Sequence, residues 1–393
     1  MTQRLEVETA LRAAAPHALV DALRDVLTTA YRATAVRLLL TDYGGTVLRA
    51  CDGSGGGPGD GEDSLSVFGS AEGRALGSQE PREQQVAHGD AVEHHLPVTV
   101  RGDRIGILTV RLPDEDSTPE VVDELRYVAD LLGREILVAE RDTDVYQRAR
   151  RVSRLTLAAE MQWQLLPARA YRDGRFALGA QLEPAYAVHG DNFDWSVEAG
   201  ELTFSVTNGM GEGIEASLLT NLAVNALRNA RRAGVGLADQ AALADQAVHD
   251  HYRGAVHVST LLLRIELATG RVEAIDAGSP QMWRMRGKSV ERIDLEAQLP
   301  LGMFEESHYT PQEFTVAPGD RLIFVSDGVY ETLSPRGEKY AEQALARAVH
   351  ATSLLPAAMV PREILRDVAD YRAAESLDDA LVLCLDWIGD GHC

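Results

Sequence analysis

Two spacings of apolar residues alternate along this chain and predict a protein of mixed helix and sheet. Over residues 1–32 leucines recur on one side of a helical projection, which predicts an amphipathic helix. The apolar run at 35–40 predicts a buried strand, and strand patterns return at 96–100 and 105–111. A further helix begins near Thr118-Pro119, where a cap residue precedes a proline. These elements predict an N-terminal α/β domain over residues 1–140.

The helical spacing continues almost without interruption from residue 119 to 166. Its middle part is strongly charged, with Val145, Ala149 and Val152 as the apolar seam. We therefore predict a linker helix over residues 141–168. Two interpretations stay open at this point: a solvated connecting helix, or a signalling helix that pairs with a second copy in a homodimer.

After Pro167 the chain becomes rich in predicted strands. The strand patterns lie at 176–182, 194–197, 202–207, 259–267, 271–277, 281–286, 313–316, 321–326 and 380–386. The helical patterns lie at 214–232, 237–251, 341–350 and 361–371. Many antiparallel strands with inserted pairs of helices predict sheets covered by helices over residues 169–390. The fold class is α+β.

Composition limits the partners of the protein. The net charge of −22 argues against nucleic acid and anionic membrane, because both require basic patches. No secretory signal is visible at the start, and no stretch approaches the ~20 apolar residues that span a bilayer. The three cysteines have no metal-ligand spacing, so the expected location is the cytoplasm. The pair His94-His95 is interpreted as a surface pair at the entry of a hairpin.

Carboxylates recur where a predicted strand meets a turn in the second half of the chain. They are Asp191, Asp194, Asp327, Asp378 and Asp379. Oxygen ligands at turns suit hard cations such as Mg²⁺ and Mn²⁺. Each motif alone is more typical of an ordinary turn or cap. The order in which these motifs occur along the chain instead favours a shared metal site.

One further turn has the same setting without a carboxylate. A strand pattern at 202–206 leads into Thr207-Asn208-Gly209-Met210-Gly211-Glu212-Gly213, and a helix pattern follows. A strand, a glycine-rich turn and a helix present one side chain at the edge of a sheet. Here that side chain is the neutral amide of Asn208.

Residues 155–387 resemble the PPM-type metal-dependent serine/threonine phosphatases, in the bacterial branch that includes the SpoIIE sporulation phosphatase. The matching blocks are Ala159-Glu160-Met161-Gln162-Trp163, Gly190-Asp191-Asn192-Phe193-Asp194, Asn208-Gly209-Met210-Gly211-Glu212-Gly213, Asp276-Ala277-Gly278-Ser279-Pro280, Leu299-Pro300-Leu301-Gly302, Ser326-Asp327-Gly328 and Asp378-Asp379-Ala380. Residues from about 15 to 140 resemble a GAF-type sensory domain less specifically. The resemblance implies a C-terminal αββα sandwich with a binuclear Mg²⁺/Mn²⁺ centre that hydrolyses phosphoserine or phosphothreonine on a partner protein.

The resemblance also assigns roles to residues. Asp191, Asp327 and Asp379 are the implied metal ligands, which act through metal-bound water. Asn208 and the carbonyl of Gly209 complete the implied metal set. Asp194, Glu212 and Asp378 are placed beside it. The implied substrate is a phosphorylated anti-anti-sigma type protein, and a small molecule is the implied ligand of the GAF-like domain.

Three positions depart from the family pattern. Asn208 stands in place of the aspartate that bridges both metals, Glu212 replaces a histidine, asparagine or lysine, and Ser279 replaces a histidine. An amide has one neutral oxygen and a nitrogen that repels cations, so the second ion should be weakened most. Two functions therefore stay open: a working phosphatase with altered metal demand, or a catalytically silent relative that binds and sequesters its partner.

Overall fold

The computed structural model describes residues 2–51, 64–86, 90–187, 190–278, 280–372 and 378–389, and divides the chain into two compact units. Unit 1 comprises residues 1–154 and unit 2 comprises residues 155–393. Within the described ranges, no helix has the length and apolar content required to cross a membrane. Each unit is described by itself below.

Unit 1 is built from six strands, five α-helices and two short 3₁₀ turns in its described residues. In chain order these are α1 (Thr2–Ala13), a 3₁₀ turn (Pro16–Ala18), α2 (Leu19–Tyr31), β1 (Ala35–Thr41), β2 (Val47–Cys51), β3 (Ser64–Ser66), α3 (Ala71–Ser78), β4 (Arg82–Gln85), β5 (Ala91–Val100), β6 (Asp103–Pro113), a 3₁₀ turn (Asp114–Asp116), α4 (Pro119–Ala139) and α5 (Val145–Ala149).

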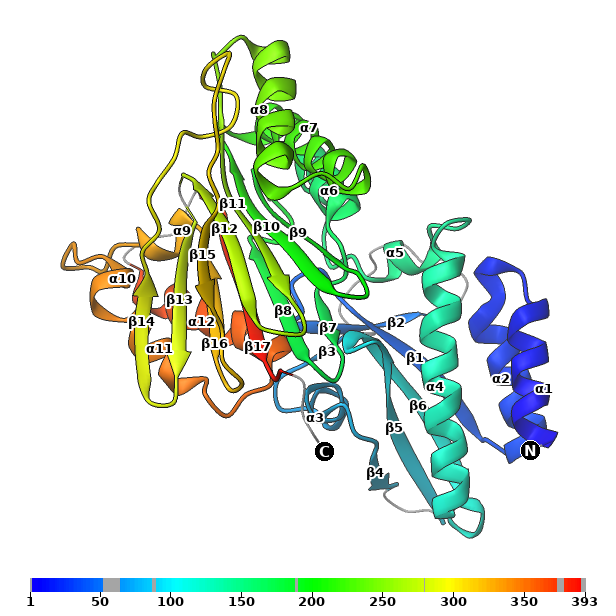
Figure 1. The fold of residues 1–393 in the computed structure, drawn as a ribbon. Coiled ribbons are helices and arrows are strands. Elements are labelled where there is room, and N and C mark those ends of the chain that lie inside the picture. Colours follow the sequence, from blue (N-terminus) through cyan, green and yellow to red (C-terminus); the bar gives the residue numbers. More distant parts are fainter. Residues whose placement is uncertain are drawn as a thin grey trace. The chain divides into compact units, whose positions relative to one another are not determined.

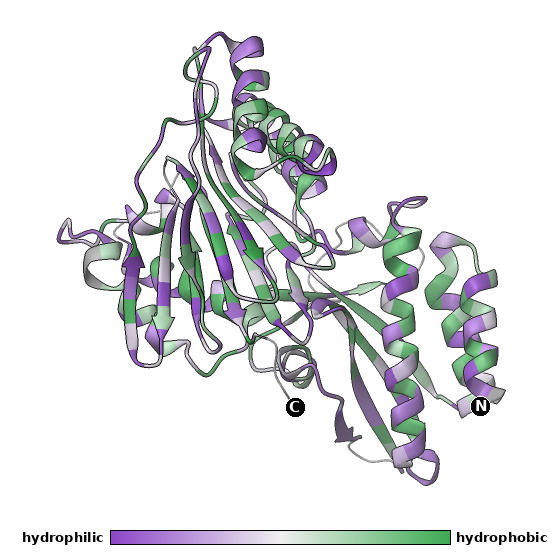
Figure 2. Cartoon of the chain, in the orientation of Figure 1, coloured by the Kyte–Doolittle hydropathy of each residue, from purple (hydrophilic) through white to green (hydrophobic). Residues whose placement is uncertain are grey.

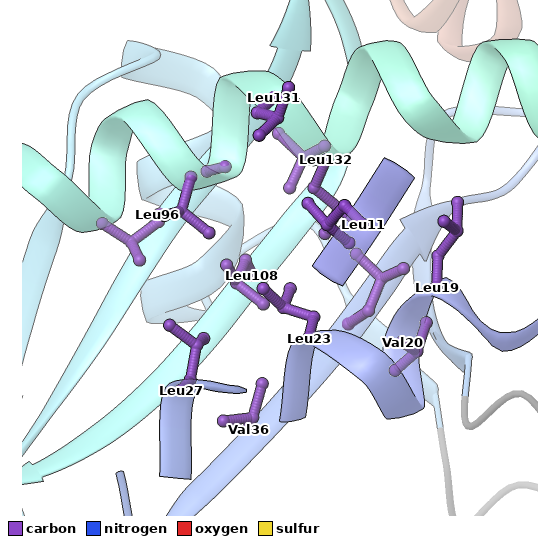
Figure 3. Close-up of a cluster of buried hydrophobic side chains, with 14 of the residues drawn as sticks. Leu11, Leu19, Val20, Leu23, Leu27, Val36, Leu96, Leu108, Leu131 and Leu132 are labelled. Atoms are coloured by element: carbon purple, nitrogen blue, oxygen red, sulfur yellow. The ribbon is translucent and has the colours of Figure 1, made fainter. Parts of the chain in front are cut away.

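The strands of unit 1 form one antiparallel sheet in the order β3-β2-β1-β6-β5-β4. Helices α1, α2 and α4 cover one face, and their leucines pack on Val36, Leu96 and Leu108 of the sheet (Figures 1 and 3). A smaller cluster joins α3 to the other face, where Ala75 and Leu76 pack with Leu39 and Ile107. Helix α4 alternates hydrophobic and hydrophilic bands along its length, as expected of a helix with one buried face (Figure 2).

Two predictions for unit 1 need correction. The helix expected over 1–32 is two helices, because Pro16 lacks the N–H that would continue α1 and instead begins the 3₁₀ turn. His94 and His95 are not a surface pair, since each side chain is only 1% exposed. Strand β5 starts earlier than expected and is covered on both faces. Ser117 hydrogen-bonds His94 Nε2 at 2.8 Å, and Thr109 lies 3.3 Å from His95 Nδ1.

The continuous linker helix predicted over 141–168 is absent from the structure. Helix α4 ends at Ala139, the short α5 spans Val145–Ala149, and α6 begins after a new cap at Thr156. Val145 and Tyr146 belong to the core of unit 1. Ala158 and Ala159 of α6 are buried in unit 2. The two short helices α5 and α6 therefore belong to two separate cores, and the helical structure is interrupted between them.

The described part of unit 2 contains eleven strands and seven α-helices. In chain order these are α6 (Leu157–Leu165), β7 (Ala170–Arg172), β8 (Phe176–Glu183), β9 (Asp191–Val197), β10 (Glu201–Gly209), α7 (Gly213–Arg232), α8 (Leu237–Tyr252), β11 (Val258–Glu266), β12 (Arg271–Ala277), β13 (Gln281–Arg286), β14 (Ser289–Ile293), β15 (Gln312–Thr315), β16 (Arg321–Val325), α9 (Asp327–Tyr330), α10 (Tyr340–Gln343), α11 (Leu345–Ala351), a 3₁₀ turn (Ala357–Met359), α12 (Val360–Tyr371) and β17 (Ala380–Trp387).

Two antiparallel sheets face each other in unit 2 (Figure 1). Their orders are β15-β12-β11-β10-β9 and β14-β13-β16-β17-β8-β7. The rings of Phe204 on β10 and Phe324 on β16 meet edge to face with centroids 4.8 Å apart, which marks the interior between the sheets. Helices α7 and α8 pack on the outer face of the first sheet, and α10, α11 and α12 pack on the outer face of the second. The predicted α+β class and αββα sandwich are confirmed.

Candidate functional site

Four predicted site residues come from strand ends at one edge of the sandwich. Asp191 is the first residue of β9 and is paired in register with Asn208 near the end of β10. Paired residues on antiparallel strands lie on the same face of a sheet. In the second sheet, Asp327 follows β16 and Asp379 immediately precedes β17, and these two strands are antiparallel neighbours. The fold therefore brings the four residues to the same edge although they are far apart in sequence.

The carboxylate of Asp379 connects the two sheets at this edge. Its Oδ2 accepts the backbone N–H of Gly190 at 2.8 Å and that of Asp191 at 3.2 Å. Hydrogen bonds from N–H groups to an ionised oxygen are the stronger kind. Asp379 is only 2% exposed, so these contacts fix its orientation in a largely dry environment.

Gly209 is required by the close approach of the strand end to α7. A Cβ at this position would lie 2.2 Å from Thr220 Oγ1 and 3.1 Å from the carbonyl oxygen of Ala216. The Gly209 N–H donates to the Gly190 carbonyl at 3.1 Å, and Thr220 Oγ1 donates to the same carbonyl at 2.7 Å. The glycine predicted from its turn motif therefore allows β9, β10 and α7 to meet beside Asp191.

Gly328 is required because its backbone lies close to the backbone of Asp379. A Cβ on Gly328 would lie 1.8 Å from the carbonyl oxygen of Asp379. The preceding residue, Asp327, accepts the Gly328 N–H at 3.0 Å on Oδ1. An Asp-Gly dipeptide at this point thus places one carboxylate next to the other with no side chain between the two backbones.

Asn208 contacts Asp327 directly. The amide Nδ2 donates to Asp327 Oδ1 at 2.6 Å. The oxygen of Asp327 thereby receives two N–H donors, one from the Asn208 side chain and one from Gly328. At this strand end the neutral amide of Asn208 therefore binds a carboxylate.

The ionised form of Asp191 is disfavoured at this edge. Burial, followed by the negative charge of Asp379, raises its pKa well above the usual range, and the charges of Asp327 and Asp378 add to this effect. A hydrogen bond from Ser326 opposes the rise. Among the described groups, Asp191 Oδ2 is buried and has no hydrogen-bond partner. Such an oxygen is suited to a cation or a proton.

The donor set suits a divalent cation but does not form a closed cage. All the candidate donors are oxygens, as Mg²⁺ and Mn²⁺ prefer. Among the described residues, however, no group of three or more His, Cys, Asp or Glu side chains is spaced to hold an ion. An ion bound at Asp191 and Asp379 therefore also needs neutral ligands, such as the Gly209 carbonyl or water.

The structure contradicts the predicted position of Asp194. Asp194 lies on the opposite face of β9 from Asp191, where its Oδ1 binds Arg228 at 2.7 Å and its Oδ2 binds Arg231 at 2.9 Å. Both arginines belong to α7. Residues three apart in a strand point to opposite faces, so the spacing itself excludes both carboxylates from one site.

The other residues placed beside the site have different positions. Asp378 is exposed, and its Oδ1 accepts the N–H of Asp379 at 3.0 Å. Glu212 is exposed at the N-cap of α7 and makes no side-chain cap hydrogen bond. Ser279 lies outside the described residues. The charge of Asp378 adds to the effect on Asp191.

Sequence comparison identifies the domain that carries this edge. Residues 198–388 match the family model of Stage II sporulation protein E (SpoIIE). This part of unit 2, the SpoIIE-type domain, is similar to that family. The match includes Asn208, Gly209, Asp327 and Asp379, and begins after Asp191. It confirms the family resemblance predicted from the sequence motifs.

A curated relative agrees with the SpoIIE match. The chain is 21% identical over 186 residues to phosphoserine phosphatase RsbU of Bacillus subtilis (strain 168). The aligned part covers 47% of this chain and 56% of RsbU, so the chain matches little more than half the length of that relative.

Two solved structures share the fold of the SpoIIE-type domain. The SiaA-PP2C domain of Pseudomonas aeruginosa superposes with a TM-score of 0.50 at 20% identity, over 58% of this chain and 93% of that one. The PP2C phosphatase domain of Bacillus subtilis SpoIIE, with a fragment of its regulatory domain, gives a TM-score of 0.50 at 14% identity, over 79% of this chain and 82% of that one. At these identities the likeness establishes a PP2C-type fold.

Residues that support the SpoIIE-type site were missed by the sequence analysis. Asn192 is fully buried and donates from Nδ2 to Gln162 Oε1 of α6 at 3.0 Å. Ser326 Oγ accepts the N–H of Leu381 at 2.9 Å. Gln162, Asn192 and Ser326 all lie inside the sequence blocks that carry the resemblance. A polar residue inside one of these blocks was the signal that could have identified them.

We expect Asp191→Asn to stabilise the metal-free protein by about 1 kcal/mol at pH 8, because it removes a buried charge that lies near other carboxylates. A raised pKa means that the folded state retains a proton that the unfolded chain loses. Wild-type stability therefore falls as pH rises through the window from the unfolded to the raised folded pKa of Asp191. The advantage of the variant should grow over the same window. Urea unfolding in EDTA at several pH values measures it, and a destabilised variant at pH 8 would contradict the burial argument.

Proposed function

We propose that this protein is a regulatory protein-serine/threonine phosphatase that hydrolyses phosphoserine or phosphothreonine on a partner protein with the help of Mg²⁺ or Mn²⁺. The observation that carries the proposal is the meeting of Asp191, Asn208, Asp327 and Asp379 at one edge of a SpoIIE-type domain. RsbU, the curated relative, is named as a phosphoserine phosphatase. A phosphorylated regulatory protein of the anti-anti-sigma type is the proposed substrate.

The protein residues have distinct tasks in this proposal. Asp191 and Asp379 would hold the cation, and the Gly209 carbonyl would add a neutral ligand. A divalent ion held there would supply activation of a water molecule and compensation of the phosphate charge. The Gly190 and Asp191 N–H groups keep Asp379 oriented, while Asn208 and Gly328 orient Asp327. The burial of Asp191 and Asp379 limits access of bulk water and strengthens every charge interaction there.

Regulation is assigned to unit 1. We propose that this unit is a GAF-like sensor for a small molecule and that residues 141–168 couple it to the phosphatase, with the homodimer as the functional form. The supporting observation is the break of the connecting segment into short helices anchored in different cores. Only the short stretch between α5 and α6 would have to change its path, while the two helices stay packed in their cores.

A second function is favoured by the Asn208 contact. If hydrolysis requires a cation at Asp327, this contact would leave the domain able to bind its phosphoprotein without hydrolysing it, and the protein would act by sequestration. Turnover under saturating Mn²⁺ distinguishes the two functions.

Hydrolysis of a phosphoserine peptide in Mn²⁺ tests the proposal. We expect Asp379→Asn and Asp327→Ala each to lower kcat/KM by at least about 10²-fold, because each removes an acidic oxygen from the centre. Asp294→Asn is the matched control, since that carboxylate is exposed and paired with Arg292 at the surface. Wild-type activity that survives both site substitutions would remove the metal centre from the mechanism. Absence of activity in wild type, with retained phosphoprotein binding, would support sequestration.

A further inference from the structure

Asp327 Oδ1 already has two hydrogen-bond donors directed at it. The Asn208 amide lies 2.6 Å away and the Gly328 N–H lies 3.0 Å away. Two N–H groups at these distances occupy the directions from which an ion would approach this oxygen. An ion that binds this atom must first displace the amide, because the Gly328 N–H belongs to the backbone.

The orientation of the Asn208 amide is determined by the same contact. Turning the amide over would place its oxygen against the Asp327 carboxylate, so that two acceptors faced each other at a hydrogen-bond distance. While Asp327 is ionised, the nitrogen therefore faces it. A cation beside Asp327 on this side would meet the positive end of the amide dipole.

No side-chain amide among the described residues donates to Asp191 or Asp379 in the way that Asn208 donates to Asp327. Asp379 Oδ2 is held by the backbone N–H groups of Gly190 and Asp191, whereas the buried Asp191 Oδ2 has no hydrogen-bond partner among the described groups. Asp191 is 2% exposed. A buried acidic oxygen of this kind requires a positive partner, and no side-chain amide competes for it.

We infer that the Asn208 amide takes the place of one of the two family cations and that the site binds a single divalent ion, at Asp191 and Asp379. This inference rests on the proposed function and specifies its metal stoichiometry. The single ion would complete its shell with carbonyl and water oxygens. Displacing the charged hydrogen bond of the amide should weaken a second ion by about 10- to 100-fold.

Titration calorimetry with Mn²⁺ alone tests the inference on the full chain. We expect one ion per chain in the wild type, two in Asn208→Asp, and loss of the wild-type ion in Asp191→Asn. Asn225→Asp is the matched control, because it adds the same charge at an exposed position on α7 and should retain one ion. Two ions of comparable affinity in wild type, no ion in wild type, or an unchanged single ion in Asn208→Asp would each overturn the inference.

Thermal unfolding gives a second readout that does not depend on turnover. In EDTA, Asn208→Asp should unfold at a lower temperature than wild type, because a carboxylate then faces Asp327 in place of a donor. Mn²⁺ should raise the Tm of Asn208→Asp more than that of wild type. Equal shifts would contradict the inference. The calorimetric and thermal measurements do not depend on phosphatase activity. A failure of the proposed function can therefore be distinguished from a failure of the metal inference.

Discussion

Replacing Gly328 by alanine is expected to destabilise the protein by about 3 kcal/mol or more and to abolish its phosphatase activity. The added Cβ would lie 1.8 Å from the carbonyl oxygen of Asp379, 2.7 Å from its carbonyl carbon and 3.3 Å from the Cα of Ala380. All three atoms belong to the backbone, so no side-chain rotation relieves the clash. The start of β17 has to move away from α9, which separates Asp379 from Asp327.

Urea denaturation followed by circular dichroism measures the loss in Gly328→Ala. Gly174→Ala is the matched control, because a Cβ at Gly174 has no atom within 4 Å. That control should stay within about 0.5 kcal/mol of wild type. A Gly328→Ala protein as stable as Gly174→Ala would show that the two strand ends do not approach as described.

The second large effect is expected from Arg228→Ala, at about 3 kcal/mol of lost stability. The Asp194 side chain is 3% exposed and depends on Arg228 and Arg231 to compensate its charge. The guanidinium of Arg228 also donates to the carbonyl oxygen of Leu165 at 2.6 Å, so it joins the end of α6 to α7 and β9. Its removal leaves a buried carboxylate with one partner and an unsatisfied carbonyl.

Two further variants separate the charge effect from simple truncation of Arg228. The exposed pair Arg253 and Asp250 provides the control, since Arg253→Ala should cost less than about 1 kcal/mol. The double variant Arg228→Met with Asp194→Leu should recover much of the lost stability, because the buried carboxylate is removed together with Arg228 and only Arg231, whose side chain is 14% exposed, loses its partner. A double variant as unstable as Arg228→Ala would indicate that packing, not charge, dominates at this position.

Sequence patterns predicted the C-terminal sandwich well because its strands have one face toward the interior. In β10 the apolar residues Leu202, Phe204 and Val206 alternate with polar residues, which marks the face toward the other sheet even though the polar residues are buried as well. The strands at both ends of the second sheet were missed. In β14 the alternation is weak, since Ser289 and Glu291 are exposed and the strand lies at the sheet edge.

Burial of strand β5 on both faces explains why His94 and His95 were wrongly predicted to be a surface pair. In β5 the side chains of His94 and His95 are both covered, one by each face of the sheet. A polar residue in such a strand looks like a surface residue because the sequence does not show what packs above it. The hydroxyls of Ser117 and Thr109 that accompany them lie 23 and 14 residues away.

Part of the candidate site could be predicted, because turn motifs in the sequence mark the ends of strands. The Asp-Gly and Asp-Asp motifs indicated Asp327 and Asp379, and the register of β9 with β10 brought Asp191 beside Asn208. The direction of the Asn208 amide could not be predicted, because it depends on a contact between residues 119 positions apart. The assignment of Asp194 failed because strand periodicity was not applied to a spacing of three.

The hydrogen bond from the Gly209 N–H to the Gly190 carbonyl has a consequence for how this protein ages. An asparagine followed by glycine loses ammonia when the next peptide nitrogen attacks the side-chain carbonyl and closes a five-membered ring. Here that nitrogen is engaged in β10, and the extended strand directs it away from the Asn208 side chain. Spontaneous conversion to aspartate is therefore suppressed, and the neutral residue encoded at position 208 persists for as long as the fold does.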